Sequence, residues 1–130
     1  MKQHKNVLIQ NSFQKAEEAL KTAEINLENN LLDGAQNRIY YSIFYAVMAL
    51  GYYNKFITSK HSQLLGWFNK KFIKDDKVFE PELFQIYQNA YKNRMESDYE
   101  FTARPNREKL VKSLNKAVYF VEIIKNYIKE

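Results

Sequence analysis

The apolar residues of this chain recur at spacings of three and four along most of its length, which is the period of a helix with one buried face. Near the N-terminus this spacing predicts a helix from about Asn11 to Asn30. The pair Asp33-Gly34 is typical of a turn, and Asp33 can cap a second helix over about residues 34–54. The second helix is apolar on most sides, so we expect it in the middle of a bundle or at an oligomer interface.

Three further helices follow from start signals and from the same spacing. Thr58 or Ser59 can cap a third helix, and Pro81 and Pro105 suit the first turns of a fourth and a fifth. Because the connections are short, neighbouring helices should be antiparallel. The sequence therefore predicts an all-α fold, an antiparallel up-and-down bundle of four longer helices plus one shorter helix.

Length and composition fit this fold and exclude several others. A chain of 130 residues suits a single domain over residues 1–130, with residues 1–10 as a frayed N-terminus. Three glycines and two prolines are too few for a turn-rich β-sandwich or barrel. The absence of cysteine excludes disulfides and thiolate catalysis, and two histidines leave little for a metal centre. We expect neither a metal nor a cofactor.

The net charge of +5 permits binding to nucleic acid or another polyanion. Basic residues gather in 54–77 and 102–130, and acidic residues in 11–30 and 78–101. This distribution indicates either a polarised surface or ordinary solvated helix faces. The sequence has no signal-peptide pattern, and its longest uncharged stretch is too short to span a membrane. We expect a soluble, cytoplasmic protein.

An arginine stands in an aromatic stripe of the fourth predicted helix. Tyr87, Tyr91, Arg94 and Asp98 follow one another at helical spacing. Arg94 can fold back into a pair with Asp98, or it can be presented in a groove. A buried arginine would need a partner, because an unpaired buried charge is strongly disfavoured.

Arg38 raises the same two possibilities on the second helix, where Tyr41 and Tyr45 follow it at helical spacing. The two histidines, His4 and His61, lie far apart in the sequence. His61 stands at the start of the third helix, where a lone histidine is more often a capping or structural residue than a catalyst.

Three segments resemble the small prokaryotic HEPN-domain proteins. The run Asn37-Arg38-Ile39-Tyr40-Tyr41-Ser42-Ile43-Phe44-Tyr45-Ala46 resembles their R-x-Y-Y-x-x-F-x-A helix. Lys60-His61-Ser62, followed by Leu64, is similar to the K-x-H-S-x-L start of their third helix. Arg94-Met95-Glu96-Ser97-Asp98-Tyr99 resembles their R-x-x-x-D-Y segment. The resemblance covers about residues 12–128, and the three segments follow one another in the same order and at the same spacing as in the family.

The resemblance implies an antiparallel helical bundle that commonly forms a homodimer. Many members accompany a small nucleotidyltransferase, often as a toxin–antitoxin pair. RNA-cleaving members carry an R-x4-6-H motif, and Arg94 matches its arginine. Tyr99 stands where the histidine is expected, and a tyrosine with an ordinary pKa near ~10 is a poor base at neutral pH.

Three functions remain open from the sequence. The first is a partner of a nucleotidyltransferase that binds nucleotide or RNA in an arginine–tyrosine cleft near a dimer interface. The second is a ribonuclease toxin with a degenerate motif, and the third is a purely structural dimerisation module. The candidate catalytic residues are Arg94, Asp98 and Tyr99. The candidate ligand-binding residues are Arg38, Tyr41, His61 and Tyr91.

Overall fold

Helices joined by short connections make up the chain in the computed structural model, which describes residues 2–99 and 105–129, with side chains over 6–95 and 105–129. The elements in chain order are α1 (Lys2–Glu28), α2 (Leu32–Tyr53), α3 (His61–Phe68), the π-helix η1 (Asn69–Asp75), α4 (Pro81–Tyr99) and α5 (Arg107–Lys129). The described ranges contain no strand, which confirms the predicted all-α bundle. None of the helices described is long and apolar enough to cross a membrane.

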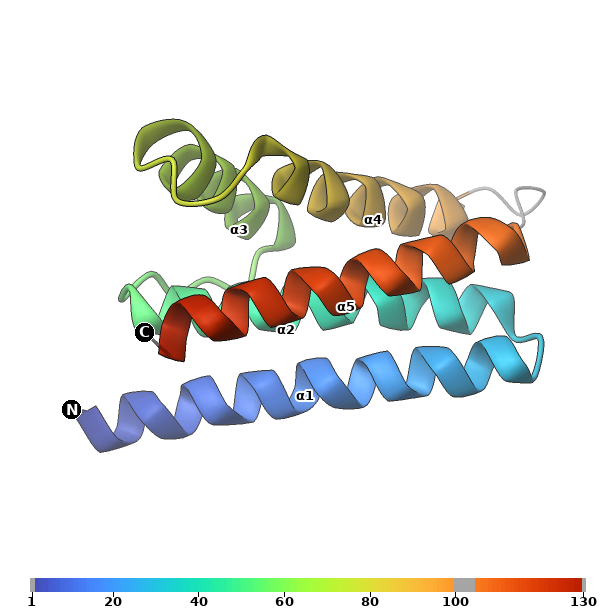
Figure 1. Ribbon diagram of the computed structural model, residues 1–130, viewed down its shortest axis with the longest axis horizontal. Helices are drawn as coiled ribbons and strands as arrows, with labels where there is room; N and C mark the ends of the chain where they lie inside the picture. The colour runs from blue at the N-terminus through green and yellow to red at the C-terminus, as the bar shows by residue number, and fades with distance from the viewer. Residues whose placement is uncertain (1, 100–104, 130) are drawn as a thin grey trace.

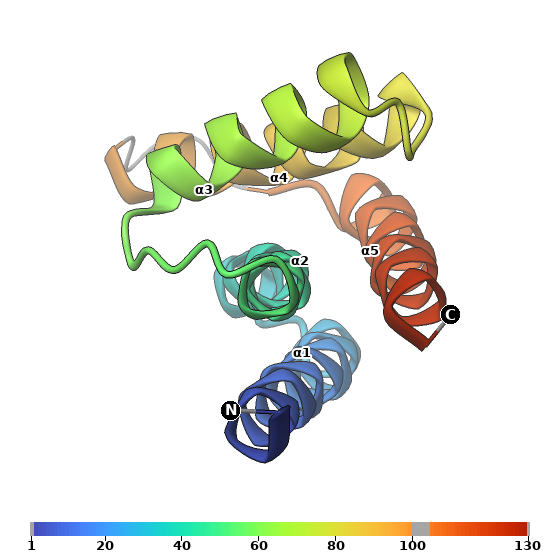
Figure 2. The ribbon, with the colours of Figure 1, turned by 90° about the vertical axis from the view of Figure 1, so that its left-hand side faces the viewer.

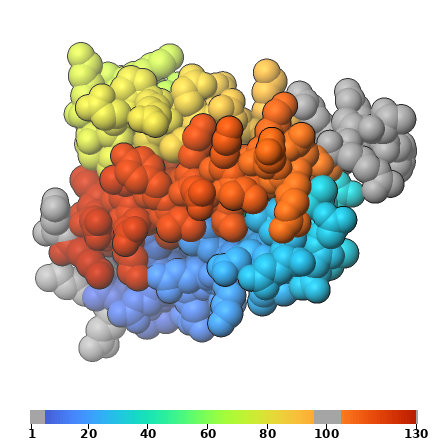
Figure 3. Space-filling model, turned by 45° about the vertical axis from the view of Figure 1, so that its right-hand side comes forward, coloured from blue at the N-terminus to red at the C-terminus, as the bar shows by residue number. Residues whose placement is uncertain are grey.

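Helix α2 lies at the centre of the bundle, with α1 on one side, α5 on another, and α3 and α4 over a third (Figures 1 and 2). Helices α1 and α4 run in one direction along the bundle, and α2 and α5 run in the other (Figure 1). The outer surface of α5 lies between those of α1 and α4 (Figure 3). The antiparallel up-and-down arrangement follows from the short connections between the elements.

The central position of α2 follows from its sequence. Its side chains are buried on most sides, including Tyr40, Ile43, Val47 and Leu50, none of which is exposed at all. A helix that is apolar nearly all round can only be stable when neighbours cover every face. Of the two environments predicted for this helix, the structure shows the middle of the bundle.

The connection between α1 and α2 differs from the predicted turn. Asn30 takes a left-handed conformation (φ 59°), and its N–H donates to the Leu27 carbonyl while the next N–H donates to that of Asn26. These two bonds form a Schellman motif that ends α1. Because the turn is complete by then, α2 begins at Leu32, and Asp33 lies in its first turn without capping it. The chain reverses at Asn30 rather than at Asp33-Gly34.

Two helix starts also differ from the prediction. Helix α1 begins at Lys2 instead of Asn11, so it includes residues expected to fray, and Ile9 from that segment joins the core. Helix α5 begins at Arg107, so Pro105 precedes the helix and does not lie in its first turn. Asn106 caps the helix, because its Oδ1 accepts a hydrogen bond from the Lys109 N–H (3.2 Å). The Arg107 side chain donates to the Leu27 carbonyl and fixes this start against the end of α1.

The third predicted helix continues from α3 into η1, where the backbone widens to a π-helix. No side chain caps its start; instead the Thr58 hydroxyl accepts a hydrogen bond from the Lys60 N–H (3.1 Å). In η1 two ion pairs join residues five apart, Lys70 with Asp75 and Lys71 with Asp76, both at 3.1 Å. Backbone hydrogen bonds in a π-helix join residues five apart, so side chains at this spacing lie close together and the pairs fit its geometry. They are exposed, and each contributes at most about 1 kcal/mol.

Gly51 of α2 and Gly66 of α3 offer a matched test of packing. A Cβ on Gly51 would lie 2.5 Å from the Phe56 carbonyl oxygen, whereas one on Gly66 would meet nothing within 4 Å. We expect Gly51→Ala to lower the free energy of unfolding by about 1–3 kcal/mol because the backbone must shift. Gly66→Ala should raise it by up to about 1 kcal/mol through helix propensity. Urea denaturation measures both, and equal effects of the two substitutions would contradict the packing seen around Gly51.

Candidate functional site

Two arginines, a histidine and several aromatic rings meet on one side of α2. We call this group the arginine–aromatic cluster. It comprises Arg38, Tyr40, Tyr41 and Phe44 of α2, His61 of α3, and Tyr91 and Arg94 of α4. Three elements supply it, so the cluster exists only in the folded bundle.

Arg94 lies over two rings at once. Its guanidinium carbon is 5.2 Å from the ring centroid of Tyr40 and 5.2 Å from that of Tyr41. The spacing of Tyr87, Tyr91 and Arg94 places them on the face of α4 that packs against α2, and the Tyr91 ring lies 6.0 Å from that of Tyr40. A cation at this distance from an aromatic face is stabilised by the ring quadrupole.

Arg38 stacks on the same platform from within α2. Its guanidinium carbon lies 4.9 Å from the centroid of Tyr41, three residues along the helix. Its Nε and Nη2 both donate to Asn37 Oδ1, at 3.2 Å and 2.9 Å. Ring and amide together fix the orientation of the guanidinium plane. Both arginines therefore contact Tyr41, and two positive charges lie beside one ring.

His61 closes the cluster from the first residue of α3. Its Nδ1 lies 2.7 Å from the hydroxyl oxygen of Tyr40, within hydrogen-bond distance. Its ring stacks on Phe44, with the centroids 4.1 Å apart and the planes 10° from parallel. It also lies 5.6 Å from the Tyr40 ring and 5.8 Å from the Tyr41 ring, the two rings that Arg94 contacts.

This environment sets the protonation states of Tyr40 and His61. Burial raises the pKa of the Tyr40 phenol well above its ordinary value, although the nearby Arg94 charge opposes this shift. Burial lowers the pKa of His61, and the positive charge of Arg94 lowers it further. Near neutral pH the cluster therefore contains a neutral imidazole that is hydrogen-bonded to a protonated phenol.

The arrangement provides the groups that phosphate binding and proton transfer need. A guanidinium offers a planar fork of donors that matches two phosphate oxygens. An uncharged imidazole can accept a proton when Nδ1–H donates to Tyr40 and leaves Nε2 free. Within the part of the chain that is described, no group of three His, Asp or Glu residues is placed to hold a metal.

The structure brings together most of the residues that the sequence singled out. Arg38, Tyr41, His61, Tyr91 and Arg94 all belong to the cluster. The backbone of α4 continues as a helix through the positions of Asp98 and Tyr99, but the side chains of both lie outside the described residues. Whether Arg94 pairs with Asp98 therefore stays a prediction.

Sequence reasoning missed the residues that hold the cluster together. The sequence does not single out Tyr40 as a site residue, yet its hydroxyl contacts His61 and its ring contacts Arg94. Phe44 supplies the ring on which His61 stacks. His61 contacts α2 through its side chain and is no cap, since Lys60 occupies that position. The signal available was Tyr40 itself, because a phenol in a fully buried stretch requires a hydrogen-bond partner.

The lowered pKa of His61 predicts an acid-sensitive fold. The unfolded state takes up a proton at the ordinary histidine pKa, while the folded state does so only at a lower pH. The contribution of His61 to stability is therefore complete above about pH 6.5 and is lost as the pH falls below it. We expect His61→Asn to show a smaller loss of unfolding free energy than wild type between pH 7 and pH 5. Urea denaturation across this range tests it, and identical pH dependence would contradict it.

Known proteins with similar sequences span nearly the whole chain. The profile of the HEPN domain matches residues 9–127. A protein of Methanocaldococcus jannaschii named "Putative toxin MJ0142" is 35% identical over 89% of this chain and 78% of its own length. A "UPF0332 protein" of Thermotoga maritima is 34% identical over 97% of this chain and 95% of its own length. A second Methanocaldococcus jannaschii protein, "Putative toxin MJ0605", is 32% identical over 94% and 90% of the respective lengths. The chain therefore belongs to the HEPN domain family.

Proposed function

We propose that this protein is a toxin-like HEPN module that binds the phosphates of RNA or of a nucleotide at the arginine–aromatic cluster. The observation that carries the proposal is the placement of Arg38 and Arg94 against one aromatic platform, Tyr40 and Tyr41. Two relatives with toxin names support the biological role.

The cluster combines two means of holding a single nucleic-acid strand. Its guanidinium groups can form charge-assisted hydrogen bonds with phosphate oxygens. Tyr91 is only half-buried, so part of its ring remains accessible for a base to stack on or for a ribose to contact. Basic groups beside aromatic rings are the usual composition of sites that bind single strands with little sequence preference.

The buried hydrogen bond under the platform supports binding by fixing the geometry in advance. Tyr40 is fully buried, and His61 holds its hydroxyl. A platform that does not rearrange loses less entropy when a ligand binds. His61 stays neutral near pH 7, so the positive charge of the cluster comes from Arg38 and Arg94.

The proposal includes the partners that the HEPN resemblance implies. The module acts as a homodimer, with the cluster near the shared interface, and as one half of a toxin–antitoxin-like pair with a small nucleotidyltransferase. In this proposal the partly exposed Tyr45, which packs against Tyr41 of the platform, belongs to the shared interface.

Removing one guanidinium should weaken RNA binding while the fold is preserved. We expect Arg38→Ala to weaken binding of a short single-stranded RNA by about tenfold, which corresponds to one charge-assisted contact. Fluorescence anisotropy with a labelled oligoribonucleotide measures this affinity. The matched control is Lys92→Ala, which removes the same charge from an exposed site on α4 outside the cluster.

Equal affinity for Arg38→Ala and wild type would contradict the proposal. A change in thermal stability or in dimer formation, with RNA affinity unaltered, would instead assign the cluster to a structural dimerisation module. Equal losses of RNA affinity in Arg38→Ala and Lys92→Ala would mean that the net charge of the protein, and not the position of Arg38, determines the affinity.

A second candidate function is RNA cleavage, and the position of His61 favours it. Tyr99 stands where the family motif expects a histidine, yet His61 lies against the same two tyrosine rings as Arg94. In this reaction a ribose 2′-hydroxyl attacks the adjacent phosphorus, and Nε2 of His61 takes up its proton. The bond to the 5′-oxygen breaks, and that oxygen takes a proton from water while the arginines hold the phosphate oxygens.

If cleavage occurs, it should depend on His61 and Arg94 together. His61→Gln should lower the cleavage rate of a labelled RNA by at least about 100-fold, because general acid–base catalysis contributes about that much. Arg94→Lys keeps the charge but loses the planar fork, and it should lower the rate as well. Cleavage that is unchanged in His61→Gln would rule out this role for His61. No cleavage by wild type between pH 5 and pH 9 would leave binding as the function.

A further inference from the structure

Asn37 of α2 holds the side chain of the residue that follows it, Arg38. The Oδ1 atom of Asn37 accepts two hydrogen bonds from the guanidinium, one from Nε (3.2 Å) and one from Nη2 (2.9 Å). Adjacent residues of a helix do not face each other, so the long Arg38 side chain has to bend toward Asn37 to form these bonds. A guanidinium only donates hydrogen bonds, so the amide atom that faces it is the oxygen.

The ring of Tyr41 holds the same guanidinium from a second direction. The guanidinium carbon of Arg38 lies 4.9 Å from the centroid of that ring. The ring limits the tilt of the guanidinium plane, because a cation is attracted to the aromatic face. The two hydrogen bonds to Asn37 limit rotation within the plane, since the N–H bonds of a guanidinium lie in it. Arg38 is therefore oriented before any ligand arrives.

The two bonds to Asn37 leave one edge of the guanidinium available. A guanidinium carries one N–H on Nε and two on each of Nη1 and Nη2. Asn37 takes the edge that Nε and Nη2 form, and the remaining N–H groups of Arg38 form no hydrogen bond with a described residue. The free edge, between Nη1 and Nη2, is a fork of parallel donors that matches two oxygens of one phosphate.

The acceptor that holds Arg38 is uncharged. An aspartate at this position could accept the same bonds, but its negative charge would offset the positive charge of the guanidinium. Within the described part of the chain no carboxylate pairs with Arg38, whereas Lys70 and Lys71 of η1 both pair with aspartates. The amide of Asn37 thus fixes the guanidinium and leaves its charge for an anion.

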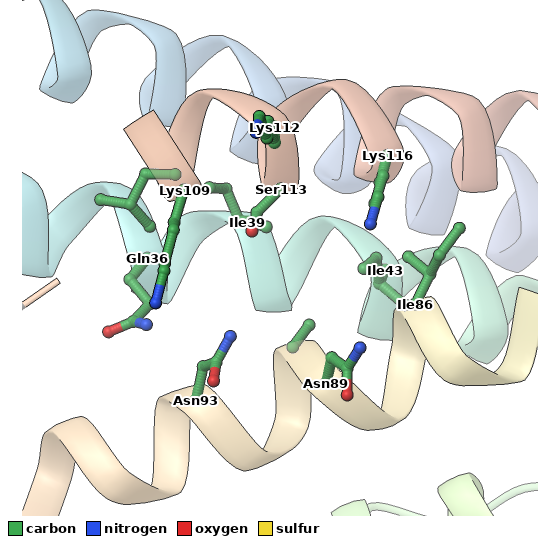
Figure 4. Close-up of a pocket in the computed structure, with 12 residues that line it drawn as sticks. Gln36, Ile39, Ile43, Ile86, Asn89, Asn93, Lys109, Lys112, Ser113 and Lys116 are labelled. Atoms are coloured by element: carbon green, nitrogen blue, oxygen red, sulfur yellow. The ribbon is translucent and has the colours of Figure 1, made fainter. Parts of the chain in front are cut away.

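The neighbouring amide of α2 belongs to a different face of the helix. Gln36 lines a hollow between α2, α4 and α5 together with Asn89 and Asn93 of α4 (Figure 4). Successive residues are turned by about 100° around a helix axis, so Gln36 and Asn37 serve different surroundings. Asn37 is therefore the amide in this turn of α2 that reaches Arg38.

We propose that Asn37 is a positioning residue of the arginine–aromatic cluster, which aims the Nη1–Nη2 edge of Arg38 at a phosphate group of the ligand. This inference rests on the proposed function, because it concerns how the cluster holds a phosphate. A side chain that is ordered in advance loses less entropy when the ligand binds. Without Asn37 the charge of Arg38 remains, but the ligand has to order the fork. The affinity therefore falls less than it does when the guanidinium itself is removed.

A double-mutant cycle measured by fluorescence anisotropy with a labelled single-stranded RNA tests the proposal. Asn37→Ala should weaken RNA binding by about two- to tenfold, the range expected when one flexible side chain must be ordered on binding. In the Arg38→Ala background the same substitution should leave the affinity unchanged, because no guanidinium remains to be positioned. The matched control is Asn115→Ala, which removes an exposed amide from α5 and should bind RNA as wild type does. Melting temperatures close to that of wild type control for folding.

The cycle separates failure of this role from failure of the binding site. Unchanged affinity in Asn37→Ala, beside a loss in Arg38→Ala, would overturn the role of Asn37 and leave the binding proposal intact. Equal losses from Asn37→Ala in the wild-type and Arg38→Ala backgrounds would mean that Asn37 acts on the RNA without Arg38, and would overturn the positioning role. Wild-type affinity in Arg38→Ala would overturn the binding proposal, and the positioning role with it.

The Nε–H group of Arg38 provides a readout that needs no ligand. Its signal in a proton–nitrogen NMR spectrum is identified by its absence in Arg38→Lys. Because a hydrogen-bonded N–H exchanges slowly with water, we expect the signal near neutral pH in wild type and its loss in Asn37→Ala. Asn37→Asp keeps an acceptor at the same place and should restore the signal. A signal that persists in Asn37→Ala, or is lost in Asn37→Asp, would overturn the proposal.

Discussion

The buried hydroxyl of Tyr40 is the constraint on which the arrangement around α2 depends. A phenol inside the bundle is stabilised by a hydrogen-bond partner, because an unsatisfied buried polar group is costly. His61 provides that partner at 2.7 Å, and to do so the start of α3 must return to the middle of α2. This hydrogen bond and the burial of Leu64 and Phe68 in the core together position α3 after α2. The same ring then offers its face to Arg94 of α4.

The electrostatics of the cluster follow from this packing. Arg94 lies close enough to Tyr40 and His61 to act on the pKa of both, and its positive charge reinforces the effect of burial on the imidazole. His61 is kept neutral, so the cluster does not gather a third positive charge near pH 7. The aromatic faces around both arginines offset part of the cost of placing two cations so close together.

Helix α4 separates two surfaces of different chemistry. Tyr91 and Arg94 face the aromatic platform, while Asn89 and Asn93, on the adjoining face, line a hollow between α2, α4 and α5 that also contains lysines of α5. A planar guanidinium offers a directional fork of donors, whereas a lysine ammonium attracts negative charge with less directional demand. Residues three or four positions apart share one face of a helix, so two adjoining faces of α4 can carry different residue types and contribute to two surfaces.

The sequence by itself determined the all-α architecture, narrowed α2 to the middle of the bundle or an oligomer interface, and singled out Arg38 and Arg94 as candidate site residues. These features depend on periodicity and on local start signals, which the chain carries residue by residue. The ends of the helices depend on which of several neighbouring residues forms the turn or the cap. Asn30 adopts the left-handed conformation that ends α1, so Asp33 does not cap α2, and Asn106 rather than Pro105 marks the start of α5. Only the tertiary structure decided that His61 joins Arg94, because both contact Tyr40, which lies 21 positions before His61 in the chain. The hollow between α2, α4 and α5 likewise required three helices to be placed side by side, since no single segment contains the residues that line it.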